Sequence, residues 1–416
     1  MHVLERLSVS YLLGIGFLTF FVFLIDFIFN LDFSSTNTFI ILISLCFALF
    51  VFDYRGIGNF VKDIKFKRPK VRLDKKTFFW GFILTIFVYT LLVNLFWPIS
   101  DWDALVLYDF RAKLFLTDTD LIHAALSNGY FLSYPLLTSL THLFVYQIGL
   151  SNPKFVYSLF YLSFVAIFYY SLRRSVSESR AMFFTVIFSL VPEIFSHATV
   201  AYTNLTYAVY LCSGIFYLYI WIKNKERSYL LLSVLLVGLS YWTRSAEPFW
   251  IVPLLIVFLT TMKNKNWKEF VYYFIVILFF HLPWKIFLHN INKITMPSSN
   301  VNVLRYLDIL KGVSFKGIFL VVNYVHKHIF STWGLIFVAF ILLFIRPAFH
   351  WKRKNNLFLY ITLSLFVLIF AGTLIFSIGY PEWQDISDSA RRMSMFLLPL
   401  MIYSIALGTN YEKHER

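Results

Sequence analysis

The sequence predicts an all-α, polytopic transmembrane helical bundle of about twelve spans, and three observations lead to this prediction. Of 416 residues, 59% are hydrophobic and 14% charged, whereas soluble domains average about half apolar and a quarter charged. The apolar residues form long runs, whereas the strands of a membrane β-barrel would alternate polar and apolar residues. The charges lie in segments between these runs. This pattern excludes a soluble enzyme, a secreted disulfide scaffold and a disordered chain.

Twelve apolar runs are the predicted spans, since roughly 20 residues of helix cross the hydrocarbon of a bilayer. Several runs are shorter than a full span. The tenth is long enough to hold an interfacial helix before its crossing. In chain order the runs cover residues 8–29, 38–53, 77–97, 155–172, 180–196, 203–222, 229–242, 247–262, 269–288, 317–345, 356–379 and 393–408.

The distribution of charge predicts the orientation in a cell membrane. Segment 54–76 carries nine Lys or Arg residues and is therefore cytoplasmic by the positive-inside rule. Counting alternate loops from there places 25 of the 37 basic residues inside and 12 outside. Of the 22 acidic residues, 9 are inside, 12 are outside and Asp26 lies in the first run. The positive excess is then entirely cytoplasmic. Both termini are predicted inside, and the first run is a retained helix because no small-residue cleavage site follows it.

The predicted organisation is a two-span hairpin with a basic loop, residues 1–76, followed by a membrane domain, residues 77–416. Three predicted outer segments are substantial: 98–154, 290–316 and 380–392. They would share one aqueous face. Any site that they build is therefore expected to be extracytoplasmic.

The first outer segment opens with two acids around a tryptophan. Asp101 and Asp103 flank Trp102 where a span ends, which suits contact with a hydroxyl, a metal or another polar ligand. For Asp103 we favour catalysis or ligand contact over the alternative, capping of the following helix. Asp101 is a weaker candidate of the same kind.

Two interfacial helices are expected in this segment. In the first, Leu107, Phe110 and Leu114 form an apolar stripe, and Asp109 and Lys113 are four residues apart, so that they can pair. A structural salt bridge is the favoured interpretation of Asp109. The second helix follows a Tyr-Pro turn, Tyr134-Pro135.

Three short motifs of this segment together resemble the first periplasmic loop of the glycosyltransferase C superfamily. In chain order they are Trp102-Asp103-Ala104, Arg111-Ala112-Lys113-Leu114-Phe115 and Tyr134-Pro135-Leu136-Leu137. The branch that they resemble comprises the family 39 and the aminoarabinose- and mannosyltransferase-like bacterial proteins. The resemblance covers residues 101–149 and extends loosely, by helix count, from residue 77 onward. The two N-terminal spans depart from the usual arrangement, in which the acidic loop follows the first span.

The resemblance implies an enzyme that transfers a sugar from a polyprenyl phosphate on the outer face of the membrane. By motif position the catalytic acid maps to Asp103, and Tyr134 belongs to the matching Tyr-Pro turn. The further candidate substrate-binding residues of this loop are Asp101, Asp109, Arg111 and Lys113.

Arg244 lies in a Trp-Thr-Arg turn that resembles a Thr-Arg-Pro-Glu-Gly turn of the same superfamily. An arginine near lipid needs an anion, and both Glu247 and a phosphate fit equally well. Asn204 stands where relatives often carry an acid. A neutral amide can orient a hydroxyl but cannot act as a base. Asn204 therefore weakens the case for a metal site with two carboxylate ligands.

Arg391 and Arg392 precede the final span, as does the arginine that superfamily members place at the carrier phosphate. Phosphate contact and simple snorkelling to the interface explain this pair equally well. Lys285, near an outer span end, is a lesser candidate.

The prediction is thus an inverting membrane glycosyltransferase with a polyprenyl-phosphate sugar as donor, a glycan, lipid or protein as acceptor, and no nucleic-acid partner. Either a cation, Mg²⁺ or Mn²⁺, or an arginine must stabilise the leaving phosphate. The metal site is unassigned. The alternatives are a flippase or transporter for lipid-linked sugars, which usually places polar sites near the bilayer midplane, and an O-antigen-like polymerase or ligase, whose large outer loop generally comes late in the chain.

Overall fold

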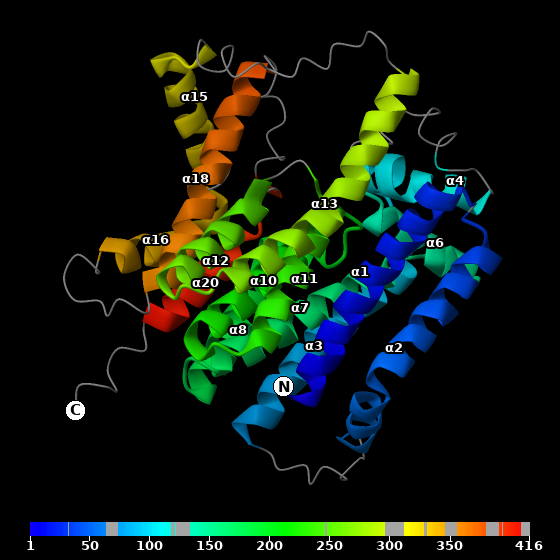
Figure 1. The fold of residues 1–416 in the computed structure, drawn as a ribbon. Coiled ribbons are helices and arrows are strands. Elements are labelled where there is room, and N and C mark those ends of the chain that lie inside the picture. Colours follow the sequence, from blue (N-terminus) through cyan, green and yellow to red (C-terminus); the bar gives the residue numbers. More distant parts are fainter. Residues whose placement is uncertain are drawn as a thin grey trace.

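All the regular secondary structure of the described residues is helical, which confirms the all-α prediction (Figure 1). The structure is a computed structural model. It describes residues 1–31, 33–63, 74–117, 121, 134–245, 248–295, 312–327, 331–345, 356–379, 391–392 and 394–408.

Each of the twelve predicted runs falls on helix. Two runs are divided between two helices: 180–196 forms α8 and α9, because Pro192 begins a new helix at its first turn, and 317–345 forms α15 and α16. The helices are α1 Val3–Phe29, α2 Ser35–Asp63, α3 Lys75–Phe96, α7 Phe155–Arg173, α8 Glu178–Ser189, α9 Pro192–His197, α10 Thr203–Asn224, α11 Arg227–Thr243, α12 Ile251–Lys263, α13 Trp267–Thr295, α15 Phe315–Val325, α16 Ser331–Ile345, α18 Asn356–Gly379 and α20 Leu397–Gly408.

Six helices of the described residues are, by length and composition, able to cross a membrane on their own: α1, α3, α7, α10, α13 and α18. Five further apolar stretches, in α2, α12, α15, α16 and α20, are between 10 and 17 residues long. The polytopic fold is thus confirmed, and the shorter stretches agree with the expectation that several of the runs fall short of a full span.

The centre of the bundle is α10. Every residue from Thr203 to Trp221 is buried, and α10 packs against α11 and α7. A helix that is hydrophobic all round is expected in such a position. The sequence at α10 has no charged stripe, so it is compatible with contact with other helices on every side.

Some polar groups between the helices form hydrogen bonds within this apolar core. The Asn94 amide donates to Ser158 Oγ and to the Ala198 carbonyl, both at 2.7 Å. The Trp242 indole donates to Thr19 Oγ1 at 3.1 Å, which ties α11 to α1. Buried polar groups need such partners because no water replaces them.

The two ends of α1 contact different segments. Near its N-terminus, Glu5 is fully buried and forms an ion pair with Arg174 at 2.7 Å. Beyond its C-terminus, the rings of Phe33 and Phe115 lie 4.3 Å apart. The predicted cytoplasmic end of α7 and the predicted outer helix α4, Phe110–Leu116, therefore lie at opposite ends of α1 (Figure 1). The division of the chain at residue 76 remains a prediction.

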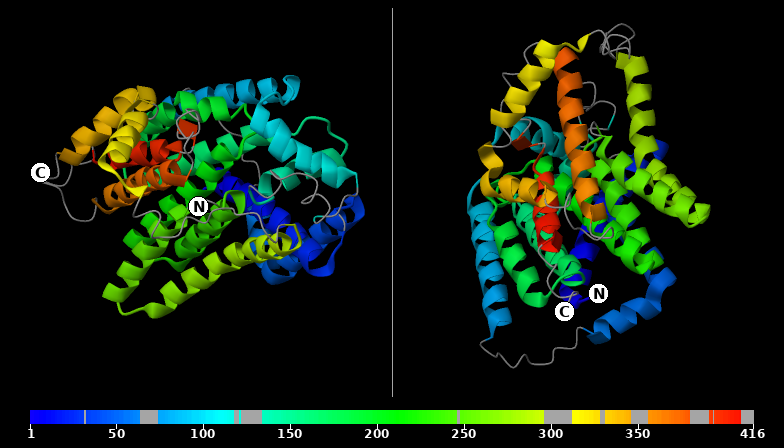
Figure 2. Two further views of the ribbon diagram at one scale, coloured as in Figure 1. Left: turned by 90° about the horizontal axis from the view of Figure 1, so that it is seen from above. Right: turned by 90° about the vertical axis from the view of Figure 1, so that its left-hand side faces the viewer.

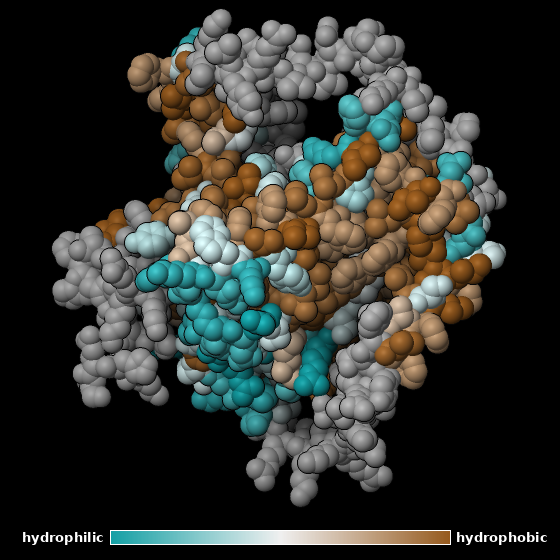
Figure 3. Space-filling model, in the orientation of Figure 1, coloured by the Kyte–Doolittle hydropathy of each residue, from teal (hydrophilic) through white to brown (hydrophobic). Residues whose placement is uncertain are grey.

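The outer portions of α13 and α18 extend past the central helices, as both Figure 1 and the right-hand view of Figure 2 show. Figure 3 shows a hydrophobic band across the face in view, with hydrophilic residues gathered on both sides of it. An apolar band between two polar ends is the surface that a membrane-embedded bundle requires.

Single cysteines placed at residues 65 and 120, both outside the described residues, are expected to react with a membrane-impermeant reagent from opposite sides. The positive-inside distribution puts residue 65 inside and residue 120 outside. Labelling intact cells and inverted vesicles, with Cys46 and Cys212 replaced by Ser, measures this. Reaction of both positions from one side would contradict the predicted orientation.

Candidate active site

The described residues of the first outer segment include three short helical pieces. They are the π-helix η1, Ala104–Asp109, the helix α4, Phe110–Leu116, and the helix α6, Leu137–Gln147. The face that packs on protein carries Ala104, Tyr108, Ala112 and Phe115. The predicted stripe, Leu107, Phe110 and Leu114, is partly exposed. π-Helical turns are rare and occur often at functional sites.

Asp109 forms the predicted salt bridge with Lys113, at 2.7 Å, and is itself buried. It also accepts a hydrogen bond from the Tyr146 hydroxyl, and His142 Nδ1 lies 3.4 Å away. Burial raises the pKa of Asp109, but the contacts with His142, Lys113 and Tyr146 outweigh it and set the pKa at about 2. The carboxylate is thus ionised and fastens α4 to α6.

Asp103 forms an ion pair with Arg392, from the segment before α20. Its Oδ2 lies 2.6 Å from Arg392 Nη1, although 289 positions separate the two residues. It makes no capping bond to η1, so the capping alternative is wrong. The Asp103 side chain is 35% exposed and that of Arg392 18%, so the pair is accessible yet partly shielded from water.

Tyr202 completes the surroundings of this pair. The Arg392 guanidinium carbon lies 5.0 Å from the centroid of the Tyr202 ring, a cation–π distance. Burial, with the charge of Asp103 next, raises the pKa of the Tyr202 hydroxyl, so it remains a proton donor at neutral pH. Tyr202 is the residue before α10, so the central helix delivers it to the site.

The neighbouring arginine is held by a second carboxylate. Arg391 Nε lies 3.4 Å from Oε1 of Glu193, a buried residue of α9. His197, one turn along α9, has its Nδ1 2.8 Å from the Glu193 carbonyl oxygen. The adjacent arginines therefore face two acids, Asp103 and Glu193, from different parts of the chain.

Arg244 joins the site through α10 and the Tyr-Pro turn. It is buried and lies at the end of α11, with Nη1 3.4 Å from Thr203 Oγ1 and Nη2 3.2 Å from the Tyr134 hydroxyl. Thr203 Oγ1 is also 2.9 Å from the Tyr108 hydroxyl of η1. Arg244, Tyr134 and the outer helix η1 thus form one hydrogen-bonded group.

Arg111 supports the same turn from the other side. Its Nη1 donates to the Tyr134 carbonyl at 2.8 Å, and its Nε to the Leu107 carbonyl at 3.0 Å. Burial lowers the pKa of Arg111 to about 10, so it keeps its charge at neutral pH. Arg111 therefore fixes the backbone of Tyr134, while Arg244 contacts its side chain.

The remaining candidate residues are placed as follows. Asn204 is buried next to Thr203. Asp101 is partly buried, and its charge acts on Lys154, whose pKa burial lowers. Lys285 is exposed on α13. Glu247 lies outside the described residues, so its pairing with Arg244 stays a prediction.

The positive charges of this site come from arginine side chains. Among the described residues, no group of three or more His, Cys, Asp or Glu side chains is arranged to hold a metal ion. The Mg²⁺ or Mn²⁺ requirement considered from the sequence remains a prediction. Sequence reasoning did not single out Glu193, Tyr202, Thr203 or Lys154.

The comparisons with known proteins yield one similar structure. No protein-family model and no curated protein sequence matches the chain. The chain is similar to the crystal structure of ArnT from Cupriavidus metallidurans in the apo state, with 11% sequence identity and a TM-score of 0.40, over 80% of this chain and 76% of that chain. Fold and site together define a polytopic helical protein with a cluster of arginines and acids at one end of its central helices.

Proposed function

We propose that this protein is an integral-membrane glycosyltransferase that takes a sugar from a polyprenyl-phosphate donor and transfers it, with inversion, on the extracytoplasmic face. The acceptor is a glycan, lipid or protein hydroxyl. The observation that carries the proposal is the pairing of Asp103 with Arg392. A base for the acceptor and a cation for the leaving phosphate lie within one hydrogen bond of each other.

The neighbouring contacts support the same chemistry. Arg391 and Arg244 add two more guanidinium groups, which bind phosphate oxygens through charge-assisted hydrogen bonds. Tyr134 and Tyr202 present hydroxyls and ring faces beside them, as sugar binding requires. The apolar surfaces of the surrounding helices suit a prenyl chain.

In the proposed reaction the acceptor oxygen attacks the anomeric carbon of the donor sugar. Asp103 takes the proton of the acceptor hydroxyl as general base. The bond between the anomeric carbon and the phosphate oxygen breaks, and its electron pair leaves with the polyprenyl phosphate. The additional negative charge on that phosphate is stabilised by arginine. A single displacement of this kind inverts the anomeric configuration.

The ion pair must open before the reaction. While Asp103 Oδ2 lies 2.6 Å from Arg392 Nη1, that oxygen and that N–H group are committed to each other. A donor phosphate that takes the place of the carboxylate on Arg392 would free Asp103 for the acceptor hydroxyl. Donor binding would thus release the Asp103 carboxylate from Arg392, so that it can act as the base.

Incubation of membranes containing the protein with radiolabelled polyprenyl-phosphate sugars tests the function. We expect label to pass from the lipid fraction to a second product, which is absent from membranes without the protein. Movement of intact labelled lipid across the bilayer without a new glycosidic product would instead identify a flippase. Label that moves as a preassembled oligosaccharide would identify a polymerase or ligase.

Replacement of both Arg391 and Arg392 by Gln is expected to weaken donor binding by at least about tenfold and acceptor binding much less. Each lost charge-assisted hydrogen bond is worth roughly 1.5 to 3 kcal/mol. The dissociation constant of the purified protein for the donor lipid measures this. Lys316→Gln, which removes an exposed base of α15, is the matched control.

Arg244→Gln is the informative comparison. If Arg244→Gln alone abolishes donor binding while the Arg391 and Arg392 double variant binds normally, the phosphate site lies at the end of α11. The assignment of the phosphate to the residues before the final span would then be wrong.

A further inference from the structure

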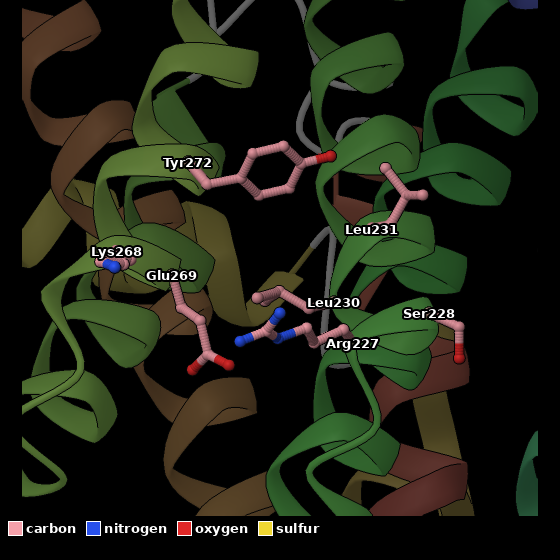
Figure 4. A pocket seen from close by; sticks show the side chains of 7 residues that line it. All are labelled: Arg227, Ser228, Leu230, Leu231, Lys268, Glu269 and Tyr272. Carbon is pink, nitrogen blue, oxygen red and sulfur yellow. The ribbon is translucent and has the colours of Figure 1, made fainter.

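The opposite end of α11 from Arg244 carries a pocket of mixed polar and apolar lining, between the first turns of α11 and α13. Its cavity has a volume of about 400 Å³, and these turns belong to the side predicted to be cytoplasmic. Arg227 and Leu231 line it from α11, and Lys268, Glu269 and Tyr272 from α13. Figure 4 shows Arg227 and Glu269 pointing toward each other across it.

The pocket offers both signs of charge. Arg227 and Lys268 can bind a phosphate, and the first turn of α11 adds backbone N–H groups that no side chain caps. Glu269, facing Arg227, provides an acceptor for a cationic group. A purely anionic ligand would satisfy the two bases but would meet the Glu269 carboxylate.

One wall of the pocket is apolar and accessible. Leu231 and Tyr272 are 41% and 42% exposed, and the next turn of α13 presents Ile275, also exposed. These side chains continue toward the predicted membrane interior. A ligand with a hydrocarbon chain attached to its polar group therefore fits the pocket better than a free phosphate compound.

We infer that this pocket binds the headgroup of a phospholipid of the cytoplasmic leaflet that carries a primary ammonium, as phosphatidylethanolamine does. The phosphate would lie against Arg227 and Lys268, the ammonium against Glu269, and an acyl chain along Leu231 and Tyr272. Basic pockets between helices at the cytoplasmic surface are suited to lipid headgroups. Glu269 selects the ethanolamine because a primary ammonium donates hydrogen bonds, whereas the quaternary ammonium of choline has none to donate.

This inference does not depend on the glycosyltransferase proposal. It is tested on the purified full-length chain in detergent by native mass spectrometry, with phosphatidylethanolamine, phosphatidylglycerol and phosphatidylcholine of the same acyl chains. We expect binding of the ethanolamine lipid about three- to tenfold tighter than that of the other two, the range for partly exposed charge-assisted contacts.

Two matched pairs of variants assign the contacts. Glu269→Gln is expected to abolish the preference for ethanolamine over glycerol, while Glu226→Gln, the residue before α11, leaves it intact. Lys268→Gln is expected to weaken ethanolamine and glycerol lipids alike, while Lys263→Gln, an exposed base at the end of α12, does not.

The lipid selectivity is the ratio of two affinities measured on the same folded protein. A general loss of stability in a variant would therefore not change this ratio. Equal affinity of the wild-type chain for the three lipids would overturn the inference. So would a Glu269→Gln variant that keeps the ethanolamine preference, because Glu269 would then only pair with Arg227. Soluble glycerophosphoethanolamine binding as tightly as the lipid would overturn the membrane source of the ligand.

Discussion

Asp103→Asn is expected to lower the rate of sugar transfer by about 10²- to 10⁴-fold, the usual contribution of a general base. The amide keeps the shape of the side chain but cannot take a proton from the acceptor hydroxyl. The rate of label transfer from the donor lipid, at saturating donor and acceptor, measures the effect. The amount of folded protein is followed in parallel by size-exclusion chromatography.

The matched control is Asp74→Asn. Asp74 caps α3 through a 2.8 Å hydrogen bond from the Thr77 backbone N–H, and asparagine caps helices about as well. The same acid-to-amide change at Asp74 should therefore leave both fold and activity unaltered. An Asp103→Asn rate within about threefold of wild type would refute the assignment of Asp103 as the base.

Glu5→Gln is expected to destabilise the protein by about 3 kcal/mol, since removal of one partner leaves a buried charge uncompensated. Glu5 accepts two hydrogen bonds from Arg174, at 2.8 and 2.7 Å, and a third from the Tyr217 hydroxyl at 3.0 Å. These contacts join α1, α7 and α10. The thermal or denaturant midpoint of the purified protein measures the loss.

Glu178→Gln is the control for that experiment. Glu178 pairs with Lys76 at 3.3 Å and with Arg173 at 3.5 Å, but all three side chains are more than a third exposed. Pairs of this kind contribute about 0 to 1 kcal/mol. Equal effects of the two Glu→Gln changes would show that the buried pair does not hold the three helices together.

The helices could be predicted from the sequence because runs of apolar residues are a local property. Each of the twelve runs falls on helix, but the central position of 203–222 could not be predicted, because its hydropathy is no higher than that of the more exposed α1 and α18. Helix ends were less predictable. The break within 180–196 depends on Pro192, which lies inside an apolar run and interrupts it without changing its hydropathy.

Candidate residues could be named from the sequence, and so could the local pair of Asp109 and Lys113, but contacts between distant residues could not. Asp103 and Arg392 were each singled out, the first by a motif and the second by its position before a span. Their contact depends on how distant helices pack, because 289 positions separate them. The same holds for Arg244 and Tyr134, which are 110 positions apart.

Glu193 and Tyr202 were missed for a physical reason. Glu193 lies within an apolar run and Tyr202 next to the start of another, so hydropathy assigns both to the membrane. An acid within a membrane-spanning run costs free energy unless it is paired. This rule could have drawn attention to Glu193. Tyr202 carried no such signal, because tyrosine is common among the helices of this chain.

The central claim is that the donor phosphate and the Asp103 carboxylate compete for Arg392. Equilibrium binding of sugar-free polyprenyl phosphate to four purified proteins tests it most directly: wild type, Asp103→Asn, Arg392→Gln and the double variant. Because the ligand carries no sugar, the measurement separates phosphate binding from transfer. The four values form a double-mutant cycle.

We predict that Asp103→Asn binds polyprenyl phosphate more tightly than wild type, because Arg392 is released from its carboxylate partner. Arg392→Gln should bind about tenfold more weakly or worse, and Asp103→Asn should have little effect in that background. Weaker binding by Asp103→Asn, or the same effect of this change with and without Arg392, would contradict the competition and with it the proposed site.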